Sequence, residues 1–308
     1  MRLALIFDKT RADTTGGYFE RAGQALGLRL ERWRARDVGK IPASSDAYLR
    51  IDHGDDYDLR LPERLRPAAF YAIDTHLRHS WKKIRRMAPW YDVVFCAQAE
   101  AARRLPNGEW LPLACDPALH RLPMMSAPVW DLGFVGTDGG HPRKFYLQAL
   151  RERYPNSVIG MADYTQMASI YGRARIGFNY SIADDVNMRI FEVLAGGALL
   201  VTNALAHDDL ARLGLEDGRH LALYRSPRRL VEVIDYYLAP AHDAQRLAIA
   251  RAGGAIALER HTYAHRLQQL LRRLSQRVGR PTGSRVASQA AGDLQSPHRM
   301  EVPSCASS

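Results

Sequence analysis

The sequence has little that could cross a membrane or form disulfide bonds. Its 308 residues include only three cysteines, Cys96, Cys115 and Cys305, and none has C-x-x-C spacing. A disulfide framework and a structural zinc site are therefore not predicted. The longest apolar stretch, residues 193–201, is far too short for a transmembrane helix, and Met1 leads into an apolar run without a cationic leader region. We therefore expect a cytoplasmic protein.

Common nucleotide and nucleic-acid motifs are also lacking. Neither G-x-G-x-x-G nor a P-loop follows the first predicted strand, residues 2–8. The formal net charge is +10, and residues 261–308 supply half of this excess through seven arginines against two acidic residues. A basic end can attract nucleic acid or an anionic membrane, but a solvated charged helix face is the simpler interpretation. We predict no specific nucleic-acid partner and leave peripheral membrane association open.

The composition is that of a globular protein with two domains. The chain is 46% apolar and 25% charged, and its length allows two domains of ordinary size. Strand-like apolar runs alternate with helical patterns in both halves, which predicts an α/β protein with two doubly wound domains facing across a cleft. Prolines and lost periodicity place the boundary near Pro123, between domains of residues 1–123 and 124–278. Residues 279–308 are poor in large apolar side chains and are predicted to be disordered.

Residues 181–203, SIADDVNMRIFEVLAGGALLVTN, carry the clearest chemistry. They predict a loop, a short helix, a Gly-Gly break that stops the helix, and a strand buried on both faces. At helical spacing one stripe is apolar, whereas Asp185, Arg189 and Glu192 follow one another on a polar stripe that is free for a ligand.

The start of this predicted helix favours an anion. Free amide N–H groups and the positive end of the helix dipole suit a diphosphate beside Asn187 and Met188. A carboxylate further along the helix, Glu192, suits neutral hydroxyls such as those of a sugar or a ribose. The alternative is that Asp184 and Asp185 are ordinary helix-start acids, with Arg189 paired to Asp185 at the surface and Glu192 solvated.

The pattern N-x-R-x-F-E-x-x-A-x-G-x-x-x-x-T, from Asn187 to Thr202, resembles the sugar-nucleotide motif of GT-B glycosyltransferases, most closely their CgeB-like branch. In that superfamily two glutamates stand eight positions apart, the first contacting the donor sugar and the second the ribose. The resemblance implies that Glu192 is the second. The position of the first is held by Asp184, which is shorter by one methylene.

The loop that opens the second predicted domain is rich in glycine and basic residues. It follows a strand, begins near Gly136 and continues as DGGHPRK, residues 138–144. Backbone amides together with Arg143 and Lys144 favour an anion in one pocket. The resemblance implies that a basic residue here pairs with the donor diphosphate, and Arg143 is preferred because its guanidinium can hold two oxygens. A solvated basic pair is the alternative.

The first predicted domain offers weaker signals. Thr15, Gly16 and Gly17 lie in a loop after the first strand, and the resemblance implies contact with the donor phosphates and acceptor; a surface turn is the alternative. Asp74 and His76 come at the end of another strand, where they suit acid–base catalysis or contacts to an acceptor hydroxyl. Asp74 could instead cap the next helix.

An acidic cluster, DHGDDYD at residues 52–58, raises the question of a metal ion. It lacks the spacing of a calcium-binding loop, and its residue types are common in turns, so no metal site is predicted. The resemblance implies transfer of a sugar from a nucleoside diphosphate donor to an unknown glycan, lipid or protein acceptor, with retention and without a metal or other cofactor. The alternative is an inactive scaffold that keeps the fold and binds nucleotides or glycans.

Overall fold

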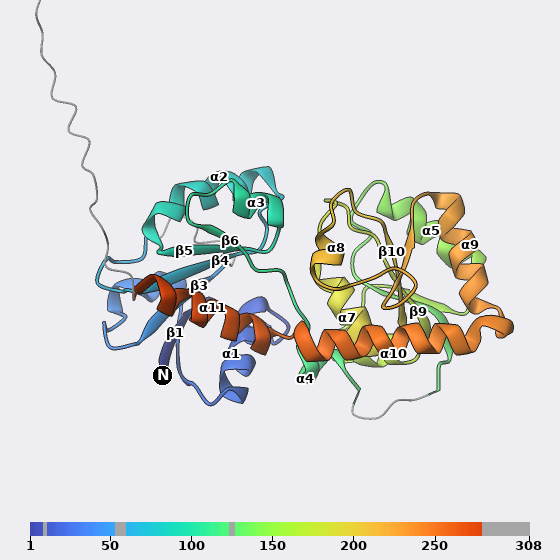
Figure 1. Cartoon of the computed structure of the whole chain (residues 1–308), viewed down its shortest axis with the longest axis horizontal. Helices are drawn as coiled ribbons and strands as arrows, with labels where there is room; N and C mark the ends of the chain where they lie inside the picture. Colours follow the sequence, from blue (N-terminus) through green and yellow to red (C-terminus); the bar gives the residue numbers. More distant parts are fainter. Residues whose placement is uncertain (9–10, 53–59, 123–126, 279–308) are drawn as a thin grey trace, which may run out of the picture.

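The structure is a computed structural model that describes residues 1–8, 11–52, 60–122 and 127–278. These residues form two parallel β-sheets that lie side by side, each with helices packed on it (Figure 1). The α/β class and the two doubly wound halves predicted from the sequence are confirmed.

The first sheet has the strand order β2-β1-β3-β4-β5-β6, and each neighbouring pair is parallel. Its order reverses between β1 and β3, and a ligand crevice is expected there. The strands are β1 (Arg2–Ile6), β2 (Arg29–Trp33), β3 (Ala47–Ile51), β4 (Ala68–Ala72), β5 (Val93–Cys96) and β6 (Gly108–Trp110). The helices are α1 (Thr15–Ala25), α2 (Arg78–Met87) and α3 (Ala99–Arg103), with 3₁₀ turns η1 (Ala35–Lys40) and η2 (Ala88–Trp90).

The second sheet has the order β11-β10-β9-β7-β8 and is also parallel, with its reversal between β7 and β9. The strands are β7 (Trp130–Val135), β8 (Ser157–Gly160), β9 (Ala174–Asn179), β10 (Leu199–Asn203) and β11 (Ala222–Tyr224). The helices are α5 (Arg143–Arg153), α6 (Tyr164–Gly172), α7 (Met188–Gly196), α8 (Asp209–Arg212), α9 (Pro227–Leu238) and α10 (Asp243–Arg260), with the 3₁₀ turn η3 (Pro240–His242).

The central strands are continuous apolar runs because helices cover both faces of each sheet. Every residue of β4 and β5 is buried, as are the first four residues of β10. Helix α7 ends as predicted: Gly197 has a φ of 95° and closes the helix in the left-handed conformation. Gly196 serves packing instead, because a Cβ there would collide with the side chain of Tyr171.

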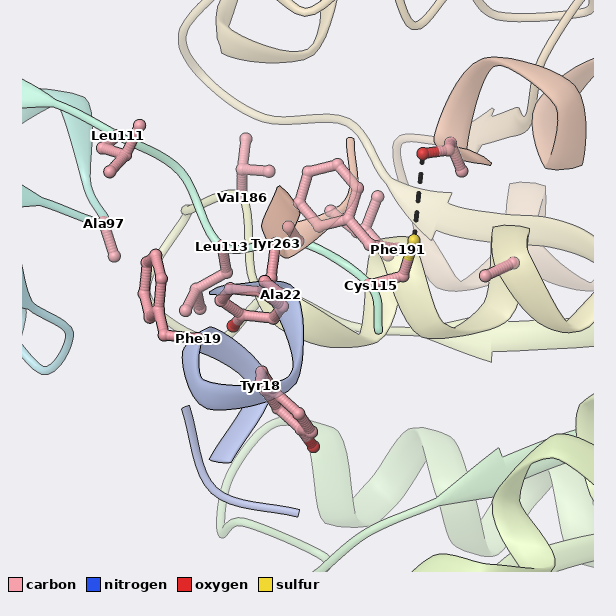
Figure 2. Close-up of a cluster of buried hydrophobic side chains, with 14 of the residues drawn as sticks. Tyr18, Phe19, Ala22, Ala97, Leu111, Leu113, Cys115, Val186, Phe191 and Tyr263 are labelled. Atoms are coloured by element: carbon pink, nitrogen blue, oxygen red, sulfur yellow. Dashed lines mark hydrogen bonds between the residues drawn. The ribbon is translucent and has the colours of Figure 1, made fainter. Parts of the chain in front are cut away.

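One buried apolar cluster continues from the first sheet's helices into the second half of the molecule (Figure 2). Tyr18 and Phe19 of α1 pack on Tyr263, with ring centroids 4.9 Å and 5.2 Å apart. Val186 and Phe191 belong to the same cluster from the other side. Shared apolar burial therefore holds the two halves in one arrangement.

The chain passes between the two halves twice, first near Cys115 and again near His261, and these two crossover segments pair with each other. Cys115 N–H donates to the carbonyl of His261 at 3.0 Å, and Tyr263 N–H donates to the carbonyl of Cys115 at 3.0 Å. Helix α4 (Pro117–His120) lies on the first crossover. Helix α11 (Tyr263–Val278) follows the second and returns to pack along α1 (Figure 1).

A buried arginine forms hydrogen bonds with both crossover segments. Arg266 of α11 is 4% exposed and donates to the carbonyl oxygens of Pro112 at 2.8 Å and Leu113 at 3.3 Å. It also bonds Nδ1 of His261 at 3.0 Å. Burial lowers the pKa of His261 to about 4, so this ring is neutral and can accept. The Arg266 side chain thus links the first crossover segment to the second by hydrogen bonds.

Two predictions concern residues outside the described ranges and therefore stay predictions. They are the domain boundary near Pro123 and the disorder of residues 279–308. Among the residues that are described, no helix is both long and apolar enough to cross a membrane.

Candidate functional site

The reversal point of the second sheet is where the sequence motif lies. The loop after β7 and the loop after β9 meet there, and α7 starts from the second of them. A polar network fixes the latter loop: the side-chain amide of Asn179 donates to Thr202 Oγ1 at 2.9 Å, and Ser181 N–H donates to Asn203 Oδ1 at 2.8 Å. The start of α7 therefore has a fixed place at the carboxyl ends of the strands.

The N-terminus of α7 is not capped by its own side chain. Asn187 occupies the N-cap position but accepts no cap hydrogen bond, and its Nδ2 donates to Ser181 Oγ at 2.9 Å. Its Oδ1 is buried and has no hydrogen-bond partner among the described residues. The first-turn amides, beginning at Met188, thus retain the capacity to bind an anion.

Two arginines converge beside this helix start. Arg189 donates to the carbonyl of Val135 at 3.1 Å, with its guanidinium carbon 4.4 Å from the centroid of Phe134. Arg143 lies over the same ring at 5.8 Å and donates to the carbonyl of Asp138 at 3.1 Å. Burial, followed by the charge of Arg189, lowers the pKa of Arg143. The two cations therefore sense each other's charge.

Glycines make room for these guanidinium groups, which lack acidic partners. A Cβ on Gly136, φ 147°, would collide with Arg189, and one on Gly139, φ 64°, with Arg143. No carboxylate of the described chain forms an ion pair with either arginine, since the Asp138 side chain pairs with Arg151 at 3.0 Å. Converging cations that form no ion pair with a described carboxylate suit a polyanion such as a diphosphate. Lys144 is exposed on the first turn of α5.

The surface pair between Asp185 and Arg189, which the alternative interpretation of the motif implied, does not form among the described contacts. Asp185 instead accepts a hydrogen bond from Nε2 of Gln98 at 3.2 Å, across the space between the two halves. The stripe of Asp185 and Arg189 is therefore not the solvated face of that alternative, because Asp185 contacts Gln98 of the first domain and Arg189 donates to Val135 of β7.

Glu192 is buried rather than solvated. Only 5% of the residue is exposed, and one of its carboxylate oxygens lies 4.0 Å from Nε2 of His120 on α4. Burial raises the pKa of Glu192 to about 7; Arg189 opposes this shift and Asp13 adds to it. The carboxylate thus sits between α7, the first crossover and the start of α1. Sequence reasoning missed His120 and Asp13, which no local pattern marks as neighbours of Glu192.

Thr15, Gly16 and Gly17 form the first turn of α1 instead of the expected loop. Thr14 caps the helix, its Oγ1 accepting from Gly17 N–H at 3.2 Å. A Cβ on Gly16 would collide with the ring of Phe7, and the hydroxyl of Thr15 bonds Tyr263. These residues are buried, so packing explains both glycines.

A cleft of 370 Å³ lies between the two halves, and residues of the loop before α7 form part of its wall. From the first domain it is lined by Thr75, His76 and Gln98 at the ends of β4 and β5, and from the second by Asp184 and Asp185. These five residues bring carboxylates and an imidazole to one space that an acceptor could enter. The hydroxyl of Thr75 also bonds the side chain of Gln98.

Two acidic candidates have distinct surroundings: Asp184 lines the cleft, whereas Asp74 precedes the lining residue Thr75 and is not itself part of the lining. Asp184 has a φ of 54°, and both of its carboxylate oxygens accept from Ala206 N–H at 3.0 Å and 3.1 Å. The pKa of Asp74 is raised by partial burial and by the charges of Asp52 and Asp185, with His76 opposing. Asp184 is therefore engaged by its own domain, whereas Asp74 favours its protonated form more than a free aspartate does.

Within the described ranges no three His, Cys, Asp or Glu side chains come together as a metal site. Most of the acidic cluster considered in the sequence, residues 53–59, lies outside those ranges.

Comparisons with known proteins agree with this fold. The profile of a family described as Glycosyl transferase-like matches residues 122–272, slightly under half of the chain. A glycosyltransferase from Rickettsia africae superposes with a TM-score of 0.61 over 91% of this chain and 99% of that one, at 10% identity. Anabaena HepE, solved with UDP and glucose, gives 0.59 over 90% and 100%, at 12% identity. The protein has the GT-B fold.

Sucrose-phosphate synthase from Thermosynechococcus elongatus has the same architecture, with a TM-score of 0.56, 12% identity and coverage of 89% of this chain and 99% of that one. A search of curated proteins gave no match. The two domains of this GT-B protein thus follow the predicted plan, while membership of the CgeB-like branch stays a prediction.

Proposed function

We propose that this GT-B protein is a glycosyltransferase that moves a sugar from a nucleoside diphosphate donor to an acceptor hydroxyl. The observation that carries the proposal is the pair Arg143 and Arg189, which converge without an acidic partner beside the uncapped start of α7. The family match over the second domain supports it.

In this proposal the diphosphate lies against the two guanidinium groups and the first-turn amides of α7. These groups stabilise the charge that develops as the bond between the anomeric carbon and the diphosphate breaks. Glu192, deeper along α7, accepts from ribose hydroxyls, and Lys144 adds positive charge at the entrance. Since the arginines and the helix dipole neutralise the diphosphate, we propose that transfer needs no metal.

The acceptor enters the cleft between the domains. Its hydroxyl oxygen forms the new bond to the anomeric carbon, and its proton leaves toward Asp74 or His76 at the end of β4. Asp184 lies on the opposite wall, where it orients the donor sugar. Retention at the anomeric carbon is proposed from the resemblance to the retaining branch.

Calorimetry with UDP, GDP, ADP and their glucose conjugates tests the donor assignment. We expect micromolar binding of at least one nucleotide and slow release of sugar from its conjugate in the presence of acceptor or water. Failure of all six compounds to bind would overturn the proposal. In the same assay, replacing Arg143 by alanine should weaken nucleotide binding. Arg153→Ala is the matched control for that variant, because Arg153 lies on the same helix as Arg143 but pairs with Asp235 at 2.6 Å.

One observation favours a second function, a scaffold that binds nucleotide without turnover. Asp184 replaces the longer glutamate of the resembling motif, and its carboxylate already bonds Ala206. Asp184→Glu separates the two functions: a rise in sugar release would indicate an impaired enzyme, whereas nucleotide binding without any release in either form would indicate a scaffold.

A further inference from the structure

The two walls of the cleft between the domains carry opposite charge. The wall from the first domain includes Arg78 of α2 and Arg104, which directly follows α3. The wall from the second domain includes Asp184, Asp185 and Asp209. A molecule that enters the cleft therefore meets cations on one side and carboxylates on the other.

The carboxylates of the cleft already have partners, whereas its two arginines have no acidic ones. The partners of the four lining acids are Ala206 N–H for Asp184, Gln98 for Asp185, Arg212 for Asp209 and Arg103 for Glu100. No carboxylate within the described ranges forms an ion pair with Arg78 or Arg104. The positive charge on the first-domain wall is thus available to an anion that enters the cleft.

Trp81 brings the two arginines together. The guanidinium carbon of Arg104 lies 4.6 Å from the centroid of the Trp81 ring. Arg78 stands three positions before Trp81 on α2, so the two side chains are neighbours on the helix surface. Trp81 also lines the cleft and is 8% exposed, and its indole N–H is buried without a hydrogen-bond partner among the described residues. One wall thus combines two guanidinium groups with an unused N–H donor.

The start of α2 adds to this positive wall. Leu77 holds the N-cap position without a side-chain cap hydrogen bond, and the first turn has no acidic residue. Residues 75–91 contain five lysines and arginines and no aspartate or glutamate. The free amides and the helix dipole favour negative charge at this end, whereas Arg78 in the first turn opposes the dipole. An anion beside Arg78 would compensate both.

We propose that the acceptor carries a phosphate group and that Arg78 and Arg104 bind this group at the first-domain wall of the cleft. The inference rests on the proposed function, because it names the chemical class of the acceptor. A phosphate fits this wall because its several oxygens can accept from two guanidinium groups and a further N–H donor at once. Repulsion by Asp184 and Asp185 keeps the phosphate off the opposite wall and directs the rest of the acceptor toward the donor side.

The test follows the indole N–H signal of Trp81 by NMR, assigned with Trp81→Phe. The probes are glucose 6-phosphate, inorganic phosphate and glucose at one ionic strength. We expect glucose 6-phosphate to shift the Trp81 signal with a dissociation constant about tenfold below that of glucose. Arg78→Gln together with Arg104→Gln should remove this difference. Equal binding of both sugars, no shift with either phosphate-bearing probe, or an unchanged difference in the double variant would overturn the inference.

Two further variants control for general charge and for the donor side. Arg103 is the neighbour of Arg104 and is also exposed, but it pairs with Glu100 and does not line the cleft. Arg103→Gln should therefore bind glucose 6-phosphate like the wild type. Arg143→Ala should do the same. Loss of binding in Arg143→Ala, with retention in the double variant, would place the phosphate on the donor side and refute the inference.

A phosphate group can belong to a soluble molecule or to a lipid headgroup, and sedimentation with vesicles separates these sources. Binding to phosphatidylcholine vesicles that contain phosphatidic acid, lost in the double variant, would indicate a lipid acceptor. Binding of glucose 6-phosphate alone would indicate a soluble one. These measurements need no nucleotide. Phosphate binding in the cleft of a protein that binds no nucleotide would contradict the proposed function alone, and nucleotide binding without phosphate binding would contradict this inference alone.

Discussion

The proposed donor side and the proposed acceptor side of this molecule are built differently. The proposed donor side places Arg143 and Arg189 at the reversal point of one sheet, within the second domain. The acceptor side is a cleft with walls from both domains, in which His76 faces Asp184. A site within one domain keeps its geometry when the domains move, whereas a site between domains depends on their relative position. Donor binding and transfer should therefore be separable by mutation.

The largest effect is expected on the donor side. Replacing Arg143 and Arg189 together by alanine removes both charges that face the diphosphate, and nucleotide affinity should fall by about 1000-fold. Calorimetry measures the loss. The exposed Arg153 on the same helix serves as control, and its alanine variant should bind like the wild type. Unchanged affinity in the double variant would place the diphosphate elsewhere.

Glu192 should make stability depend on pH. Its pKa rises from 4.5 in the unfolded chain to about 7 in the folded one, so the folded state binds its proton more tightly. The free energy of unfolding should therefore fall as pH rises between these values, by about 3 kcal/mol in total. Glu192→Gln lacks this decline.

Urea unfolding of both forms at pH 4.5 and pH 8 isolates the effect, because His120 and His261, with pKa values lowered to about 4, contribute to both forms alike. A stability difference between the variant and the wild type that does not change with pH would show that folding does not raise the pKa of Glu192.

On the acceptor side, His76→Ala should lower the rate of sugar transfer by about 100-fold with little change in nucleotide affinity. His76 lines the cleft, and none of the donor-side contacts described above involves it. Steady-state rates together with calorimetry measure the two effects. The exposed His79, in the first turn of α2 and not among the residues that line the cleft, is the control. A parallel loss of nucleotide affinity would remove the distinction between the two sides.

The smallest effect is expected for Asp184. Asp184→Ala loses the hydrogen bonds from Ala206 N–H and places alanine at a φ of 54°, which should cost about 1 kcal/mol of stability. Asp184→Asn tolerates this φ and keeps one acceptor, so it should be closer to the wild type in thermal unfolding. Equal stability of both variants would show that the Ala206 contact is unimportant.

Local pattern determined much of this protein. Apolar runs such as those of β4 and β5 specified buried parallel strands, and the motif from Asn187 to Thr202 specified where α7 starts and where Gly197 stops it. These features depend on the backbone geometry of neighbouring residues, which the order of residue types in one segment controls. The GT-B architecture followed from the same alternation of elements.

Only the tertiary structure decided which segments meet. It buried Glu192 beside His120, paired Asp185 with Gln98 instead of Arg189, and placed Gly16 in a helix turn against Phe7. It also tied both crossovers to Arg266. Each of these contacts joins residues that are distant in the chain or whose exposure depends on a neighbouring element. Sequence periodicity indicates which face of an element is buried, but the partner of that face is set by the packing of the whole chain.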